Sequence, residues 1–502
     1  MKIEFPSREF DDAVAAVCHG LVSEEQACAL NELLARDSGA RDDYILRLEL
    51  HSRLASQLDL FAPAASDENE TAASGRIPFP GGNASRRAAG SVGRRKIVWA
   101  LAVAAGFVLL AALGWRLKFR FPSPTREATP IAVTAAETDW KPSSANLPGE
   151  EFPRINSERR AQFRIKAPAA KVVSVDLAGP LTTTKGEDGV WTVTTAPLGI
   201  GFHFYHVIID GESLPDPATR IFRGGGGEGF SSGIEIPTGE DFHERKNVPH
   251  GEVREQNYFS RTTDESRRIF VYTPPGYDRD AAARFPVLYL LPGAGEDETC
   301  WSAQGRASQI LDNLIAEKKA APMLVVMAGG VARRPGETQG APRVPSDWNR
   351  RFITLDEVFM HDLIPFIDGT YRTVADGKHR AIAGLSLGGA QAVAIALTHP
   401  DQFAHVGGFS GIGGMPGWTF DPHTAYGGVM ADADSFNREM RVFFMSVGGD
   451  ESEWMSTNIK RYRETLQSMG IHHVFYASPD TTHEWHTWRR SLREFAPLLF
   501  KE

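Results

Sequence analysis

The sequence contains little cysteine and has no excess of basic residues. Three cysteines in 502 residues are too few for a disulfide framework. None of them stands in a C-x-x-C pattern or in a Cys/His cluster with zinc spacing. The formal net charge of −9 provides no basic surface, so we expect no nucleic-acid partner. The length itself predicts about three domains.

Residues 1–60 are predicted to form a small helical head. Ser23 and Gln26 match a capping box, and leucines follow them at helical spacing. Residues 61–95 are rich in Ala, Ser, Gly, Asn and Arg and show little periodicity, so we expect a flexible linker there.

Residues 97–115 form a run without a charge and predict a transmembrane helix. At a rise of about 1.5 Å per residue, such a helix just crosses a hydrocarbon core of about 30 Å. Trp99 and Trp115 suit the two membrane interfaces. Similar numbers of basic residues flank the run on either side, so charge alone does not orient it. Residues 116–155, rich in Pro, Ser, Thr and Glu, are predicted to be a tether.

Short strand patterns separated by Gly- and Asp-containing turns fill residues 156–240 and predict a small β-sandwich. One of these strands, residues 202–211, carries His203, Tyr205 and His206. These three side chains either line a sugar site or pack within the sandwich. The segment contains no nucleophile with a base, so we expect it to supply no catalytic group.

From residue 250 to residue 502, apolar strand patterns alternate with helical ones. This alternation predicts an α/β fold with a mostly parallel sheet and helices on both faces. Ligand and catalytic sites of such sheets form at the carboxyl ends of the strands.

The segment Gly384-Leu385-Ser386-Leu387-Gly388-Gly389 follows an apolar run and precedes a helix-forming run. A G-x-S-x-G sequence in this context predicts a nucleophile elbow with Ser386 as the nucleophile. The amide of Leu387 at the start of the helix is a candidate oxyanion donor. The Gly-rich loop that begins at Pro292 is predicted to supply the second donor, the amide of Ala294.

A serine hydroxyl needs a base and an orienting carboxylate to react near neutral pH. In the expected chain order, the acid and then the histidine follow the serine. His483, in the loop after the last predicted strand, is the candidate base, and His486 is the alternative. The acid is either Asp450 or Glu451, which end the preceding strand.

The C-terminal part resembles the feruloyl and acetyl-xylan esterase family of carbohydrate esterases, relatives of esterase D and enterochelin esterase. The similarity lies in Tyr-Leu-Leu-Pro-Gly-Ala-Gly (289–295), Arg-Ala-Ile-Ala-Gly-Leu-Ser-Leu-Gly-Gly (380–389) and His-Glu-Trp-His-Thr-Trp-Arg (483–489). The family usually has His-Gly where this chain has Pro292-Gly293. The usual position of the family's acid favours Glu451, with Asp450 adjacent.

Two further segments resemble known modules. Leu21-Val22-Ser23-Glu24-Glu25-Gln26 resembles the cytoplasmic segment of FecR-like anti-sigma regulators. That resemblance implies a single-pass protein of the bacterial inner membrane, with a cytoplasmic head, a protein partner for the head and the C-terminal part outside the cytoplasm. Asp-Gly-Val-Trp (188–191) and its surroundings resemble the immunoglobulin-like N-terminal module of bacterial esterases.

Together, the resemblance and the candidate residues predict a membrane-tethered serine esterase that needs no metal or cofactor. The resemblance implies feruloyl or acetyl esters on carbohydrates as substrates. A siderophore ester hydrolase or an acyltransferase of the same superfamily is the alternative. A non-catalytic binding or signalling protein is the alternative from another class, and it would require an incomplete triad.

Overall fold

The computed structural model describes scattered positions between residues 7 and 40, and then residues 139–225, 229–337, 352–412, 421 and 423–501. The chain divides into two compact units, Met1–Arg126 and Glu127–Glu502. The predicted linker, the predicted membrane helix at residues 97–115 and the tether up to residue 138 lie outside the described residues. Among the described residues, no helix is both long and apolar enough to cross a bilayer.

In the first unit, the described positions are mostly helical and fall within the predicted head. Apolar side chains among them pack into a small core made of Phe10, Ala13, Val14, Ala29, Leu30, Leu33 and Ala40.

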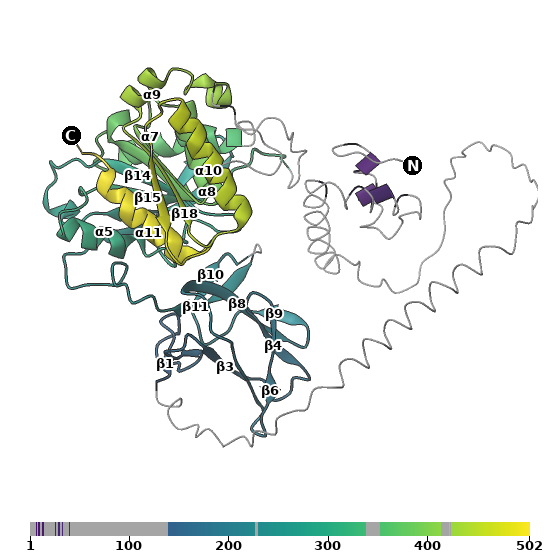
Figure 1. Ribbon diagram of the computed structural model, residues 1–502. Coiled ribbons are helices and arrows are strands. Elements are labelled where there is room, and N and C mark those ends of the chain that lie inside the picture. Colours follow the sequence, from purple (N-terminus) through teal and green to yellow (C-terminus); the bar gives the residue numbers. More distant parts are fainter. Residues whose placement is uncertain are drawn as a thin grey trace, which may run out of the picture. The chain divides into compact units, whose positions relative to one another are not determined.

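The second unit begins with two antiparallel sheets, which we call the β-module (Figure 1). One sheet has the order β1-β2-β3-β7-β6, and the other has the order β10-β11-β8-β4-β5 with β9 paired to β8. The strands are β1 Lys141–Pro142, β2 Arg154–Ile155, β3 Ala161–Lys166, β4 Val173–Asp176, β5 Pro180–Thr182, β6 Thr184–Lys185, β7 Val190–Thr194, β8 Gly201–Ile209, β9 Glu212–Leu214, β10 Ile221–Arg223 and β11 Phe230–Ile236.

A shared core explains why these short strands form a sandwich. In β3, buried positions alternate with exposed or half-buried ones, so Phe163 and Ile165 face inward. They pack there with Val175 of β4 and Val207 of β8, which belong to the other sheet. The predicted boundary at residue 156 is therefore too late. Strands β1 and β2 lie within the predicted tether, and two-residue strands are too short to show alternation in the sequence.

An eight-stranded sheet organises the C-terminal domain, in the order β12-β13-β15-β14-β16-β17-β18-β19. Its first two pairings are antiparallel and the others are parallel. The strands are β12 Glu252–Ser260, β13 Glu265–Thr273, β14 Val287–Leu291, β15 Leu324–Ala328, β16 Arg380–Leu385, β17 His405–Phe409, β18 Val442–Gly448 and β19 Val474–Ser478. The central strands β14 to β17 are buried at every position, as expected for parallel strands covered on both faces.

Helices cover the two faces of this sheet and create two cores. Helices α5 and α11 share one core with Leu288, Leu290 and Ala383 of the strands. Helices α7 to α10 share the other core with Tyr289, Leu291 and other strand residues. The helical segments are η2 Tyr277–Arg279, α5 Ala307–Ala316, α6 Ile353–Glu357, η4 Val358–Leu363, α7 Ile364–Thr370, η5 Gly377–His379, α8 Leu387–Thr398, η6 Ala425–Gly428, α9 Ala433–Glu439, α10 Glu453–Ser468, α11 Trp485–Phe495 and η7 Ala496–Leu498.

A buried ion pair joins the β-module to α11. Arg489 of α11, which is fully buried, binds the Glu235 carboxylate of β11 with both terminal guanidinium nitrogens. Arg306 donates to the same carboxylate at 3.0 Å. Burial opposes the charge of Glu235, but Arg489 and Arg306 outweigh it and lower the pKa of this group to about 2. Removing one partner alone would leave an uncompensated buried charge at this junction, at a cost of about 3–5 kcal/mol.

Candidate active site

The serine of the predicted elbow occupies a strained turn between β16 and α8. Ser386 has φ 49° and ψ −118°, a combination that non-glycine residues rarely adopt. Two glycines permit the turn. A Cβ on Gly384 would lie 2.4 Å from the Gly388 carbonyl, and a Cβ on Gly388 would lie 2.2 Å from the Pro292 carbonyl oxygen. The elbow and the loop that begins at Pro292 are therefore in close contact.

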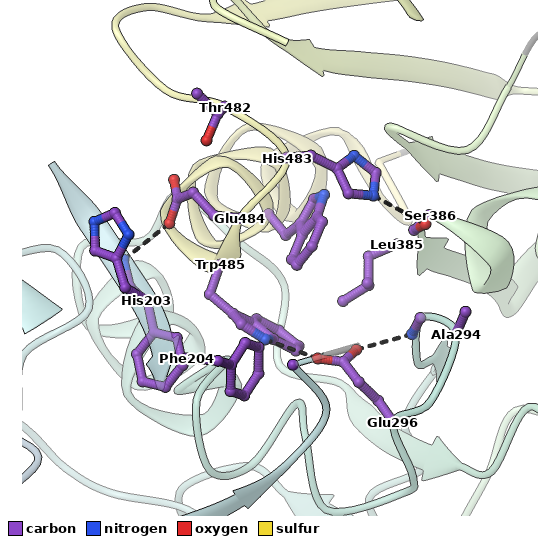
Figure 2. A pocket seen from close by; sticks show the side chains of 14 residues that line it. His203, Phe204, Ala294, Glu296, Leu385, Ser386, Thr482, His483, Glu484 and Trp485 are labelled. Atoms are coloured by element: carbon purple, nitrogen blue, oxygen red, sulfur yellow. Dashed lines mark hydrogen bonds between the residues drawn. The ribbon is translucent and has the colours of Figure 1, made fainter. Parts of the chain in front are cut away.

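The candidate base lies against this serine. His483 follows β19, and its Nε2 is 3.0 Å from Ser386 Oγ. Figure 2 marks this contact with a dashed line. Its Nδ1 is 3.0 Å from Glu451 Oε2. Trp488 packs edge-on against the imidazole with ring centroids 5.1 Å apart, which restricts its orientation. These contacts form a Ser-His-acid relay in the geometry of nucleophilic catalysis.

Of the two candidate acids, the structure brings Glu451 to the histidine. The Glu451 side chain is fully buried, whereas Asp450 is exposed. Glu451 Oε1 accepts a hydrogen bond from the Gly448 amide at 2.9 Å and another from the Ser410 hydroxyl. Its two oxygens are therefore divided between His483 and these two donors, which fixes the direction of the carboxylate.

The alternative base, His486, lies elsewhere. It is fully buried in α11, and its Nε2 is 2.7 Å from Glu240 Oε2 of the segment after β11. Burial lowers the pKa of His486 to about 4, and the nearby Arg490 cation adds to the effect. His486 is thus a junction residue, and its three-residue offset from His483 places it in the first turn of the helix rather than in the loop.

The two predicted oxyanion donors flank the serine. Leu387 is the first residue of α8, where amides lack an intrahelical acceptor. Ala294 lines the same cavity as Ser386, on the loop that contacts the elbow. The preceding amide, that of Gly293, donates to Glu296 Oε2 at 2.9 Å and is already engaged. Among the described residues, no cluster of His, Cys, Asp or Glu could hold a metal ion.

Glu296 is a second acidic group at this site. Its Oε2 accepts from the Gly293 amide, and its Oε1 accepts from Trp485 Nε1 at 2.9 Å. Burial raises the pKa of Glu296 to about 7, although these hydrogen bonds favour the charged form. The side chain therefore connects the oxyanion loop to the start of α11 while lining the cavity.

A cavity of about 440 Å³ opens onto Ser386 and His483. Four aromatic side chains are among its lining residues, namely Phe202 and Phe204 of β8 and Trp485 and Trp488 of α11. His203 lines this cavity as well (Figure 2). Tyr205 and His206, the two other sugar-site candidates of that strand, are not among its lining residues. Tyr205 is buried in the sandwich and donates to Asp216 at 2.7 Å, and His206 Nε2 lies 3.1 Å from Ser231 Oγ.

Sequence reasoning missed three residues of the site. Ser410 follows β17, and its only signal was a serine directly after an apolar strand that neighbours the elbow strand. In the sequence, Glu296 is one of three consecutive acidic residues after a Gly-rich loop, a pattern that indicates no particular role. Phe204 lines the cavity from a strand that local patterns assigned to a separate module.

The chain is similar to several known proteins. The family described as "Putative esterase" matches residues 260–499. An endo-1,4-beta-xylanase/feruloyl esterase of Xylanibacter ruminicola is 37% identical over 373 residues, 72% of this chain and 48% of that protein. This chain thus spans about half the length of that relative.

The chain is also similar to solved structures. The enterobactin esterase of Shigella flexneri, solved in the presence of enterobactin, is 17% identical with a TM-score of 0.50. The similarity covers 67% of this chain and 92% of that one. A ferulic acid esterase of Anaeromyces mucronatus is 22% identical over 51% of this chain and 93% of that one, with a TM-score of 0.44. Residues 260–499 therefore match the family described as putative esterase, and the enterobactin esterase shares their fold.

Proposed function

We propose that the protein is a serine esterase that cleaves carboxylic esters through an acyl-enzyme. Ser386 Oγ attacks the ester carbonyl as His483 Nε2 takes its proton, and Glu451 stabilises the resulting imidazolium. The amides of Leu387 and Ala294 bind the oxyanion. The tetrahedral intermediate expels the alcohol, which receives the proton from His483. Water then repeats the sequence and releases the acid.

One observation carries this proposal. A strained Ser386, a histidine nitrogen at 3.0 Å from its hydroxyl and a buried carboxylate at 3.0 Å from the other histidine nitrogen converge on one cavity. A non-catalytic binding protein has no physical reason to maintain a strained serine and a buried carboxylate in this arrangement.

For the substrate, we propose esters of the feruloyl or acetyl type on carbohydrates. The feruloyl esterase name of the Xylanibacter relative supports this class. A siderophore ester is the second candidate, supported by the enterobactin esterase fold. The aromatic walls of the cavity favour an acyl group with a ring in either case.

The full chain should be assayed side by side on methyl ferulate, acetylated xylan and enterobactin. We expect the highest kcat/KM on the ferulate ester and no turnover of any ester by Ser386→Ala. Turnover confined to enterobactin would replace the carbohydrate-ester assignment by the siderophore one. Equal hydrolysis by wild type and Ser386→Ala would refute the serine mechanism.

We further propose that the protein is anchored by one membrane helix at residues 97–115, with the helical head in the cytoplasm and the esterase outside it. The uncharged run and the FecR-like head support this topology, and the β-module is proposed to be immunoglobulin-like. Protease added to intact spheroplasts should remove the esterase domain and spare the head. Protection of the esterase domain would reverse the orientation, and complete release by a salt wash would refute the span.

A further inference from the structure

The cavity at Ser386 is built by two parts of the chain that sequence patterns keep separate. Besides residues of the esterase domain, its lining includes Phe202, His203 and Phe204 of β8 and Gly225 of the following loop. Figure 2 shows Phe204 beside Trp485 and Glu296. The side-chain positions agree, since a Cβ on Gly224 would meet both the Phe204 ring and Glu296 Cγ within about 3 Å. One wall of the cavity therefore belongs to the β-module.

A hydrogen bond fixes this wall to the residue next to the catalytic histidine. Glu484, the residue after His483, accepts a hydrogen bond from the Phe202 amide of β8 at 3.0 Å. The same carboxylate caps α11 through the Thr487 amide at 3.1 Å. A Cβ on Gly201 would lie 2.4 Å from Glu484 Oε2, so β8 approaches the histidine loop as closely as a glycine permits.

A second contact, between buried charges, joins α11 to the strand that pairs with β8. Strand β11, which pairs with β8, carries Glu235, and Glu235 binds the fully buried Arg489 of α11. Strand β8 is thus fixed to α11 at the histidine loop by Glu484 and further along the helix by Glu235. A wall anchored at two points in this way is part of the site rather than a loosely tethered neighbour.

We propose that Phe204 is a specificity-determining residue that receives an aromatic ring of the acyl group, an inference that rests on the proposed esterase function. A carbohydrate polymer is larger than about 440 Å³, so we place the acyl side of the ester in the cavity and the alcohol side toward solvent. Phe204, Trp485 and Trp488 present aromatic surfaces there. Offset and edge-to-face packing suits a planar ring, and an acetyl group would leave this wall without contact.

The test compares methyl ferulate with methyl acetate, which share a leaving group, on the full-length wild type and the Phe204→Ala variant. We expect kcat/KM for methyl ferulate to fall at least tenfold, mainly through KM, and kcat/KM for methyl acetate to stay within twofold. Phe204→Leu, which keeps an apolar wall without the ring, should lie between. Phe230→Ala is the matched control, because Phe230 is an exposed phenylalanine of β11 that does not line the cavity.

An equal change on both esters, or no change on either, would overturn the inference. An unaltered thermal midpoint of Phe204→Ala, together with normal methyl acetate turnover, shows that the variant lacks only the aromatic contact and that its β-module is folded. A wild type that hydrolyses neither ester would overturn the proposed function and the inference together. A wild type active on both, with an unselective Phe204→Ala, would overturn the inference alone.

Discussion

Replacing Glu451 by glutamine tests how this site controls the protonation of its histidine. Glu451 accepts from His483 with one oxygen and from the Gly448 amide and Ser410 hydroxyl with the other. An amide has one acceptor oxygen and one NH₂ group. If the oxygen faces His483, the NH₂ group is set against the Gly448 donor. If the NH₂ group faces His483, it stabilises the tautomer in which Nδ1 accepts and Nε2 can no longer take the serine proton.

The size of the effect follows from the loss of this orientation. In the best-studied triad, the corresponding change lowers kcat about 10⁴-fold, which equals about 5.5 kcal/mol of transition-state stabilisation. Glu451 likewise lies against the Nδ1 of the histidine and is buried, so we expect kcat to fall about 10³–10⁴-fold in Glu451→Gln. Asp450 is exposed, and exposed charge pairs are worth about 1 kcal/mol or less, so Asp450→Asn should lower kcat less than tenfold.

Steady-state kinetics on methyl ferulate measure both variants, and a circular dichroism spectrum with a thermal midpoint shows that each remains folded. Near-normal turnover by Glu451→Gln, with Asp450→Asn inactive, would transfer the role to Asp450. If both variants retained full activity, neither carboxylate would act as the acid of the triad, and the reasoning from the hydrogen-bond geometry would be wrong.

Three further outcomes are expected. The pKa of His486 is lowered in the fold, so its contribution to stability is complete above about pH 6.5 and is lost as the pH falls toward 4; His486→Asn should reduce the loss of urea stability between pH 7 and 5 by up to about 2 kcal/mol. The pKa of Glu296 is raised to about 7, so its contribution to stability is complete below about pH 4.5 and is lost as the pH rises to 7. The free energy of unfolding of Glu296→Gln should therefore rise by up to about 3 kcal/mol relative to that of wild type between pH 5 and 8. Parallel plots of unfolding free energy against pH for the two proteins would contradict this. Gly388→Ala should abolish activity and cost several kcal/mol, because its Cβ would meet the Pro292 carbonyl oxygen at 2.2 Å, whereas Gly369→Ala in α7, with open space around it, should leave both unchanged or stabilise the fold by up to about 1 kcal/mol.

Local chemistry explains why much of the site could be predicted. A strand, a serine between glycines and a helix form one continuous segment. The elbow can therefore be predicted from Gly384, Ser386 and Gly388 without knowledge of the rest of the chain. Chain order then restricts the base and the acid to the ends of later strands, which is where His483 and Glu451 lie. The alternating pattern of apolar strands and helices likewise indicates the α/β sheet.

The same local reasoning cannot distinguish residues that are close in sequence but whose side chains point in different directions. Asp450 and Glu451 are adjacent, and only the turn after β18 buries one and exposes the other. Likewise, His486 differs from His483 because α11 begins between them, which turns His486 toward Glu240. Backbone direction at such a turn depends on the packing of both flanking elements.

The sequence by itself thus determined the fold class of residues 250–502 and the candidates for the nucleophile and its partners, since those signals lie within single segments. The tertiary structure decided which carboxylate meets His483, the support from Ser410 and the place of Phe204 in the cavity wall. These features join segments far apart in the chain. The place of Phe204 depends in addition on how the β-module docks on α11, where the buried Glu235–Arg489 pair joins them, and no local periodicity encodes that docking.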